Sequence, residues 1–164
     1  FAGYLIDLIV TMLGKPEKVT PFMKQTRDDG LIDNGLAVLE YERAAATVRV
    51  SVEEVDGMKH RRLIVCGTNG TVELCPIEPP GNLYYTQPLT VRLTLKNGNV
   101  QYSSGTHHVN CGVLGSRYEA QLIEFARIIR GEIRNPYSCQ HEYLLHEVLL
   151  AACGYSKPEK GVKQ

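Results

Sequence analysis

Two of the three asparagine–glycine pairs in this 164-residue chain, each next to β-rich runs, limit its fold more than any other feature. These two pairs are Asn69-Gly70 and Asn97-Gly98. Asn-Gly is typical of the tight turn in a β-hairpin, because both central residues of that turn need a positive φ. Successive hairpins pair their strands in antiparallel fashion. The predicted hairpin strands are residues 62–66 with 71–75, and residues 89–95 with 100–103.

Three more strands are expected nearer the start of the chain, at residues 19–26, 36–43 and 47–55, with a turn at Asp33-Asn34-Gly35. In the third of them, valines at positions 48, 50 and 52 fall on one face. We expect this face to lie in the core. The opposite face then needs cover, which favours a homo-oligomer that forms through an open sheet face.

Helical patterns flank the strands. Apolar residues fill most of the circumference of residues 3–13, which predicts a largely buried helix that ends at Gly14. Apolar side chains recur at helical spacing over residues 118–129, and Ser138 is a suitable N-cap for a last helix over residues 139–153. The order predicts an α+β fold, with a mostly antiparallel sheet and helices packed on one face of it.

Composition argues against several classes of protein. Lys plus Arg number 18 and Asp plus Glu number 18, so the basic excess of a nucleic-acid-binding protein is missing. No apolar run approaches the roughly 20 residues of a membrane-spanning helix, and the chain opens with no secretory signal. Five scattered cysteines form no C-x-x-C pair, which favours buried thiols in a cytoplasmic protein. The chain opens inside an apolar segment, so we expect it to be one part of a longer protein.

A metal site is not expected. His141-Glu142 and His146 resemble the zinc motif H-E-x-x-H, but the two histidines are five residues apart. On a helix this spacing turns them roughly 140° from each other, so they cannot reach one ion together. Pairing of Glu142 with His146, four residues on, is the expected alternative.

Asp7 is the one charged residue inside the first helix, and Tyr4 lies one turn before it on a neighbouring position. A carboxylate in an apolar helix needs a partner. Asp7 therefore either caps or pairs with a nearby arginine, or it binds a substrate. His107 and His108 follow the last predicted hairpin, where we expect a loop that either contacts a ligand or lies in solvent.

The sequence holds no G-x-G-x-x-G at a strand-to-helix turn, so no nucleotide-binding site is expected in this chain. It also lacks the G-x-S-x-G turn of serine hydrolases.

The motifs in order resemble the C-terminal domain of the glucose–fructose oxidoreductase and inositol dehydrogenase family, also called Gfo/Idh/MocA. Tyr4 and Asp7 lie in a segment similar to the family's D-x-G-x-H-x-x-D pattern, which leads into L-G-x-P. Residues 64–74 are similar to its G-T-x-G-T-x-x-L hairpin. The resemblance covers nearly the whole chain through segments 3–9, 12–16, 35–42, 46–52, 64–74, 118–127 and 130–132, and through the final predicted helix.

The resemblance implies a two-domain oxidoreductase. Residues 1–164 would form a single C-terminal domain for substrate binding and oligomerisation, and an N-terminal Rossmann domain outside this chain would hold NAD or NADP and supply a lysine. The reaction implied is hydride transfer between nicotinamide and a carbinol carbon of a sugar, cyclitol or related polyol. This chain alone is then not competent for catalysis, because it cannot hold the hydride carrier.

Roles carry over to matching positions only. Asp7 matches the last Asp of the pattern and is expected to bind substrate oxygens. Tyr4 stands where the pattern has its acid–base His. A phenol releases its proton far less readily than an imidazolium, but it donates a hydrogen bond without any change in its pKa. Tyr4 is thus the candidate catalytic residue, with His107 and His108 expected to line the substrate cleft. The alternative is a non-enzymatic α+β module for oligomerisation or ligand binding that has lost catalysis.

Overall fold

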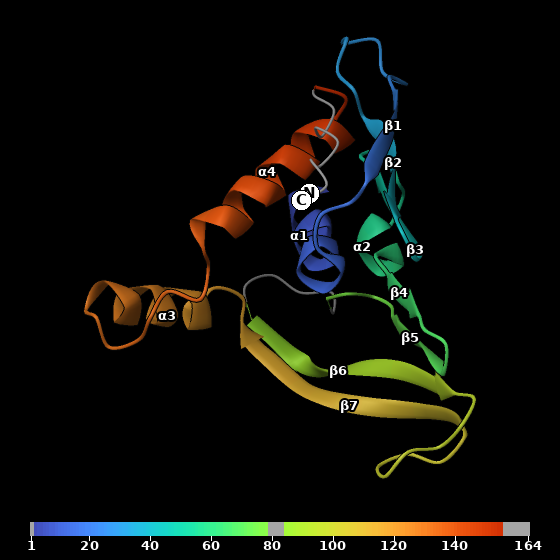
Figure 1. Ribbon diagram of the computed structural model, residues 1–164, viewed down its shortest axis with the longest axis vertical. Helices are drawn as coiled ribbons and strands as arrows, with labels where there is room; N and C mark the ends of the chain where they lie inside the picture. The colour runs from blue at the N-terminus through green and yellow to red at the C-terminus, as the bar shows by residue number, and fades with distance from the viewer. Residues whose placement is uncertain (1, 79–83, 156–164) are drawn as a thin grey trace. The chain divides into compact units, whose positions relative to one another are not determined.

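The computed structural model describes residues 2–78 and 84–155 and divides the chain into two compact units (Figure 1). The first unit combines Phe1–Glu54 with Asn135–Gln164, and the second is Val55–Arg134. That the two act as a single domain stays a prediction.

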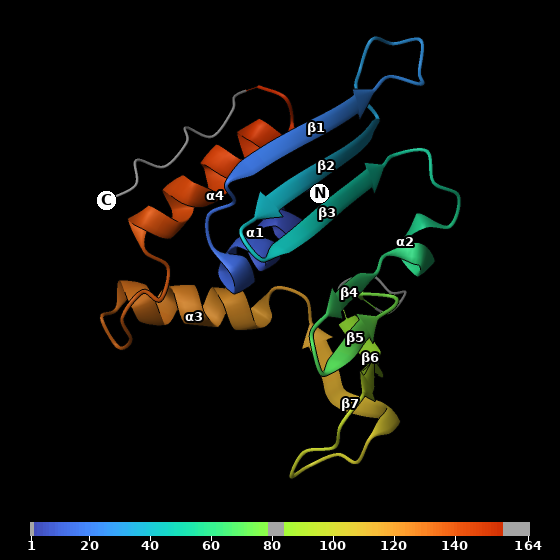
Figure 2. The ribbon, with the colours of Figure 1, turned by 45° about the vertical axis from the view of Figure 1, so that its right-hand side comes forward.

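The first unit is a three-stranded antiparallel sheet with two helices on one face (Figure 2). The sheet has the order β1-β2-β3, and α1 lies against β3 and α4 while α4 also lies against β1 and β2. Its elements are α1 (Ala2–Leu13), β1 (Lys18–Lys24), β2 (Asn34–Tyr41), β3 (Ala44–Ser51) and α4 (Cys139–Ala152).

The core of the first unit lies between the helix pair and the inner face of the sheet. Val48 and Val50 face it, as their alternation predicts, but Val52, the third valine of the pattern, follows the end of β3 and is 63% exposed. Thr47 and Arg49 lie on the outer face and are exposed. The outer face of β3 is therefore polar, and it is not the apolar surface through which an oligomer was expected to form. The buried hydrophobic residues of this core are Ile6, Ile9, Val10, Val19, Ala37, Leu39, Val48, Val148, Ala151 and Ala152.

Helix α1 forms where the sequence predicts it, and Gly14 ends it with a φ of 74°. The prediction that it is largely buried is wrong. Tyr4 is 77% exposed and Met12 is 50% exposed, because the sheet and α4 cover only one side of the helix.

The predicted turn at Asp33-Asn34-Gly35 is also wrong, since Asn34 begins β2 opposite Lys24 and the chain turns at residues 27–30 instead. Asp33 is 5% exposed, and its carboxylate accepts hydrogen bonds from the side-chain hydroxyl of Thr26 at 2.7 Å and from the Thr26 amide at 2.9 Å. These bonds close the β1–β2 connection.

The hydroxyl of Thr26 lowers the pKa of Asp33, and the Thr26 amide adds to the effect, while burial works against it. A lowered pKa stabilises the fold above the unfolded-state pKa, ordinarily about 3.9, and this contribution is lost as pH falls through the lower folded-state pKa. Thr26→Val should therefore raise the pKa of Asp33 toward its ordinary value, measured by a carboxyl ¹³C titration. Thr47→Val, on the exposed outer face of β3, should leave it unchanged. An unshifted Asp33 in Thr26→Val would contradict this account.

The second unit contains a four-stranded antiparallel sheet of order β4-β5-β6-β7. Residues 67–69 link β4 to β5, which confirms the first predicted hairpin, with Gly70 already the first residue of β5. The elements of the second unit are α2 (Gly57–His60), β4 (Leu63–Cys66), β5 (Gly70–Leu74), β6 (Tyr84–Leu95), β7 (Gly105–Ser116) and α3 (Glu119–Ile129).

The second hairpin differs from its prediction. Residues 100–103 form no strand, because the Asn99 side chain accepts the backbone N–H groups of Gln101 and Tyr102 at 2.8 Å each and holds a turn there. The strand that returns along β6 is β7, so the expected loop around His107 and His108 is a strand.

Helix α3 confirms the predicted apolar stripe but not its burial. Leu122, Phe125 and Ile129 are 65%, 61% and 68% exposed. Figures 1 and 2 both show α3 to one side of the β4–β7 sheet rather than across its face. The α+β class with antiparallel pairing is confirmed, while the single expected sheet is two sheets, of which α1 and α4 cover one.

The described helices are at most 14 residues long, and none of them has the length and apolar content needed to cross a membrane. All five cysteines are free thiols. The prediction that most of them are buried is wrong, since four are exposed, including Cys111, for which exposure was expected, and Cys153 is half-buried.

Candidate functional site

The outward face of α1 carries Asp7, and its partner comes from α4. Asp7 Oδ1 lies 2.8 Å from His141 Nε2, with the Asp7 side chain 43% exposed and that of His141 25% exposed. The sequence left open whether Asp7 pairs with an arginine or binds a substrate. The structure gives it a histidine 134 residues away and still leaves the pair open to solvent.

The start of α4 fixes the position of His141. Ser138 is the N-cap, as predicted, and its Oγ accepts the backbone N–H of His141 at 3.1 Å. Further along the helix, Val148, Ala151 and Ala152 are buried in the core. The cap and the buried end together hold the first turn of α4 beside α1.

The geometry also fixes the proton on the imidazole ring. An ionised carboxylate can only accept hydrogen bonds, so Nε2 of His141 carries the hydrogen that faces Asp7. In the neutral ring, Nδ1 is then the nitrogen with a free lone pair. No hydrogen bond joins Nδ1, or Oδ2 of Asp7, to the part of the chain that the structure describes. The pair thus offers two acceptor atoms to another molecule.

Tyr4 lies one turn before Asp7 on α1 and is 77% exposed. Its hydroxyl makes no hydrogen bond with residues 2–78 or 84–155, so it is available as a donor. Leu8 and Met12, also exposed, continue this face along the helix. Tyr4, Asp7 and His141 are called the α1 site below.

His146 takes no part in the α1 site. Its Nδ1 lies 2.8 Å from the backbone carbonyl of Glu142, and not from the Glu142 carboxylate as the spacing suggested. Within the described ranges, no three His, Cys, Asp or Glu side chains lie close enough together to hold a metal ion.

His107 and His108 lie in the second unit, on β7. Successive residues of a strand point to opposite faces of its sheet, so the two rings cannot both face one cleft. His107 pairs with Leu93 on the apolar face, and its Nε2 lies 2.8 Å from the Ser103 carbonyl oxygen. His108 pairs with Arg92 on the polar face. That either ring contacts substrate stays a prediction.

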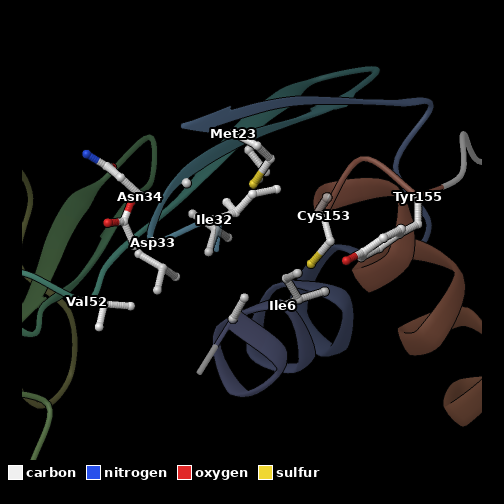
Figure 3. A pocket seen from close by; sticks show the side chains of 14 residues that line it. Ile6, Met23, Ile32, Asp33, Asn34, Val52, Cys153 and Tyr155 are labelled. Carbon is white, nitrogen blue, oxygen red and sulfur yellow. The ribbon is translucent and has the colours of Figure 1, made fainter. Parts of the chain in front are cut away.

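The first unit also contains a pocket of about 270 Å³, which sequence reasoning missed (Figure 3). It opens between the start of α1, the ends of the strands and the end of α4. Figure 3 shows Ile6, Met23 and Cys153 around an apolar interior, with Tyr155 at one side. Tyr4 and Asp7 do not line it, so the pocket and the α1 site are separate features of one unit.

Comparison with known proteins relates this chain to a family and to several solved structures. The family model for the GFO/IDH/MocA C-terminal domain matches residues 1–73, which include α1 with Tyr4 and Asp7. No match was found among curated protein sequences.

Several solved structures share the fold. An oxidoreductase from Agrobacterium radiobacter in complex with NAD+, L-tartaric acid and magnesium is 15% identical, with a TM-score of 0.66 over 93% of this chain and 44% of its own. KijD10, a 3-ketoreductase from Actinomadura kijaniata in complex with TDP-benzene and NADP, is 15% identical, with a TM-score of 0.64 over 93% and 44%. An oxidoreductase from Bacillus cereus is 12% identical, with a TM-score of 0.61 over 99% and 58%.

This chain spans about half the length of these structures, and the TM-scores establish a shared fold. The family match covers the segment that carries Tyr4 and Asp7 of the α1 site, while His141 lies outside it. The resemblance seen in the sequence is confirmed over this segment: residues 1–73 match the model of the GFO/IDH/MocA C-terminal domain family.

Proposed function

We propose that this chain is the substrate side of an NAD(P)-dependent oxidoreductase that acts on a carbinol carbon of a sugar, cyclitol or related polyol. The observation that carries the proposal is the α1 site, where a half-exposed carboxylate and an exposed phenol share one helix face within the family-matched segment. The nucleotide-binding half would be a Rossmann domain outside this chain, as in an enzyme of about twice its length.

The roles follow from donor and acceptor chemistry. Tyr4 would donate a hydrogen bond to the carbinol oxygen, and Oδ2 of Asp7 would accept one from a neighbouring substrate hydroxyl. A bound dinucleotide supplies the hydride acceptor or donor. The residues of this chain bind and orient the polyol, so that the carbinol C–H bond lies toward the partner domain.

A direct assay tests the proposal. We expect the intact protein that contains this chain to reduce NAD+ or NADP+ when mixed with at least one member of a panel of sugars, cyclitols and linear polyols, followed by the absorbance of reduced nicotinamide. The 164-residue chain alone should bind neither dinucleotide in a calorimetric titration. Dinucleotide binding by this chain, or an intact protein inert with every pair, would overturn the proposal.

The second candidate, a non-enzymatic oligomerisation or ligand-binding module, is favoured by two observations. Tyr4 stands where the family pattern has histidine. The β4–β7 sheet also has one apolar face, on which Val72, Leu93, Val91 and Val109 are only half-buried. An inactive intact protein that still forms dimers would favour this module.

Under either function we expect a cytoplasmic homo-oligomer that forms through the apolar face of the β4–β7 sheet. Val91→Lys should place a charge in that face and shift the protein toward monomer in sedimentation velocity. Thr90→Lys, on the exposed opposite face of the same strand, should leave the assembly unchanged. A wild-type protein that sediments as a monomer at high concentration would contradict the oligomer.

A further inference from the structure

We propose that His141 takes the proton of the substrate hydroxyl during oxidation of the carbinol, a role that rests on the proposed function. Oxidation of a secondary alcohol breaks two bonds. The hydrogen on carbon leaves with the bonding electron pair, as hydride. The hydroxyl hydrogen leaves as a proton, and the electrons of the O–H bond remain on oxygen as the carbonyl forms. The hydroxyl proton therefore needs an acceptor that is close to the carbinol oxygen.

Neither of the other two α1-site residues suits this task as well as His141. Tyr4 carries a hydroxyl that is a donor in its ordinary state, so it stabilises the oxygen rather than removing its proton. Asp7 already uses one carboxylate oxygen to hold His141 at 2.8 Å. An imidazole changes its protonation near neutral pH and is the most common proton acceptor in enzyme sites.

The Asp7–His141 contact prepares the ring for that role. Because Nε2–H faces the carboxylate, the lone pair of the neutral ring is on Nδ1, and no described residue occupies it with a hydrogen bond. When Nδ1 receives the proton, the imidazolium gains a charge-assisted bond to Asp7. A base oriented by a carboxylate is the usual design for proton transfer at a nucleophile or hydroxyl.

The position of His141 is fixed before any substrate binds. Its backbone N–H is held by the Ser138 cap at 3.1 Å and its ring by Asp7, so backbone and side chain each have an anchor. The side chain is 25% exposed, which leaves it accessible from outside. Tyr4 lies one turn before Asp7 on the same helix, and Asp7 contacts the imidazole, so the phenol and the imidazole are both neighbours of Asp7.

The hydride and the proton released in the proposed step each have an acceptor. The carbinol loses hydride to NAD+ or NADP+, the hydroxyl proton passes to Nδ1 of His141, and the products are the carbonyl compound, the reduced dinucleotide and a His141 imidazolium paired with Asp7. The imidazolium returns its proton to water before the next turnover. In the reverse direction the same group donates the proton to the carbonyl oxygen.

The test compares His141→Gln with His146→Gln in the intact protein. His146 lies on the same helix, and among the described residues its ring bonds only to a backbone carbonyl, so it is a matched control. We expect His141→Gln to lower kcat by roughly 10²–10⁴-fold with KM within about threefold of wild type. His146→Gln should stay within about twofold of wild type, and both variants should unfold at similar temperatures.

A second readout is independent of turnover. Long-range ¹H–¹⁵N NMR of the ¹⁵N-histidine-labelled intact protein should show His141 protonated on Nε2 when the ring is neutral. Addition of the polyol substrate without dinucleotide should shift Nδ1 of His141 and leave His146 unchanged. The His141→Gln spectrum assigns the resonance.

The outcomes separate the two proposals. If wild type is active and His141→Gln keeps more than a third of its kcat, His141 is not the proton acceptor and the proposed function stands. If His141→Gln loses activity only with a matching rise in KM and a lower unfolding temperature, its role is structural and this inference fails. If wild type is inactive with every polyol and dinucleotide, both proposals fail together.

Discussion

Asp7→Asn should lower kcat/KM of the intact protein by roughly 10²–10⁴-fold, the largest effect on activity expected from a single substitution outside His141. The amide keeps the shape of the side chain and a carbonyl oxygen for Nε2 of His141. It removes the charge that would stabilise the imidazolium, and it weakens the acceptor offered to a substrate hydroxyl. The measurement is steady-state kinetics on the active polyol, with the unfolding temperature recorded in parallel.

Glu142→Gln is the control for Asp7→Asn. Glu142 is exposed and immediately follows His141 on α4, so the substitution removes one negative charge nearby without touching the pair. We expect an activity within about threefold of wild type, because exposed charges are screened. Equal losses in the two variants would show that net charge, and not the Asp7–His141 contact, governs activity.

Leu39→Ala should cost about 2–5 kcal/mol in the free energy of unfolding, the largest loss of stability expected in the first unit. Leu39 lies on β2 between the sheet and the helix pair and is fully buried, so the shorter side chain leaves a cavity among the core residues. Urea unfolding followed by far-UV circular dichroism measures the change.

Leu36→Ala makes the same chemical change three residues earlier on β2, on the outer face. Leu36 is 37% exposed, so we expect a cost of about 1 kcal/mol or less. Equal costs for the two variants would contradict the placement of the core on the helix side of the β1–β3 sheet.

Local patterns predicted the elements of the fold better than their packing. The helix at α1, its end at Gly14 and the Ser138 cap follow from local chemistry, and all three form as expected. Exposure depends on which elements meet, and this is not encoded locally. Tyr4 and Phe125 fit apolar helix faces in the sequence, yet both are mainly exposed.

Strand pairing explains the other errors. The glycine-rich stretch around His107 and His108 has the composition of a loop, but pairing with β6 makes it a strand with Gly105 and Gly112 at positive φ. The division into two sheets likewise depends on which strands pair. Alternation along a single strand, as at Val48, identifies an inner face but not the sheet to which the strand belongs.

Two of the three residues of the α1 site, Tyr4 and Asp7, were predicted from the sequence, and His141 was not. A carboxylate inside an apolar helix signals that Asp7 needs a partner, and the resemblance to the family assigns Asp7 and Tyr4 to the substrate. The partner, His141, is 134 residues away in the sequence. It belongs to the His141–His146 segment, whose spacing does not fit a zinc site, so no other role for it followed from the sequence. One signal was available: the Ser138 cap places His141 in the first turn of a helix, where a side chain can reach a neighbouring helix.

The most direct measurement is a crystal structure of the intact protein with a dinucleotide and a polyol that it oxidises. This account predicts that the carbinol oxygen lies within hydrogen-bond distance of Tyr4 or His141, with a neighbouring hydroxyl on Asp7. A polyol bound elsewhere, in the pocket beside Ile6 and Cys153 or along β7, with the face of α1 in contact with solvent only, would contradict it.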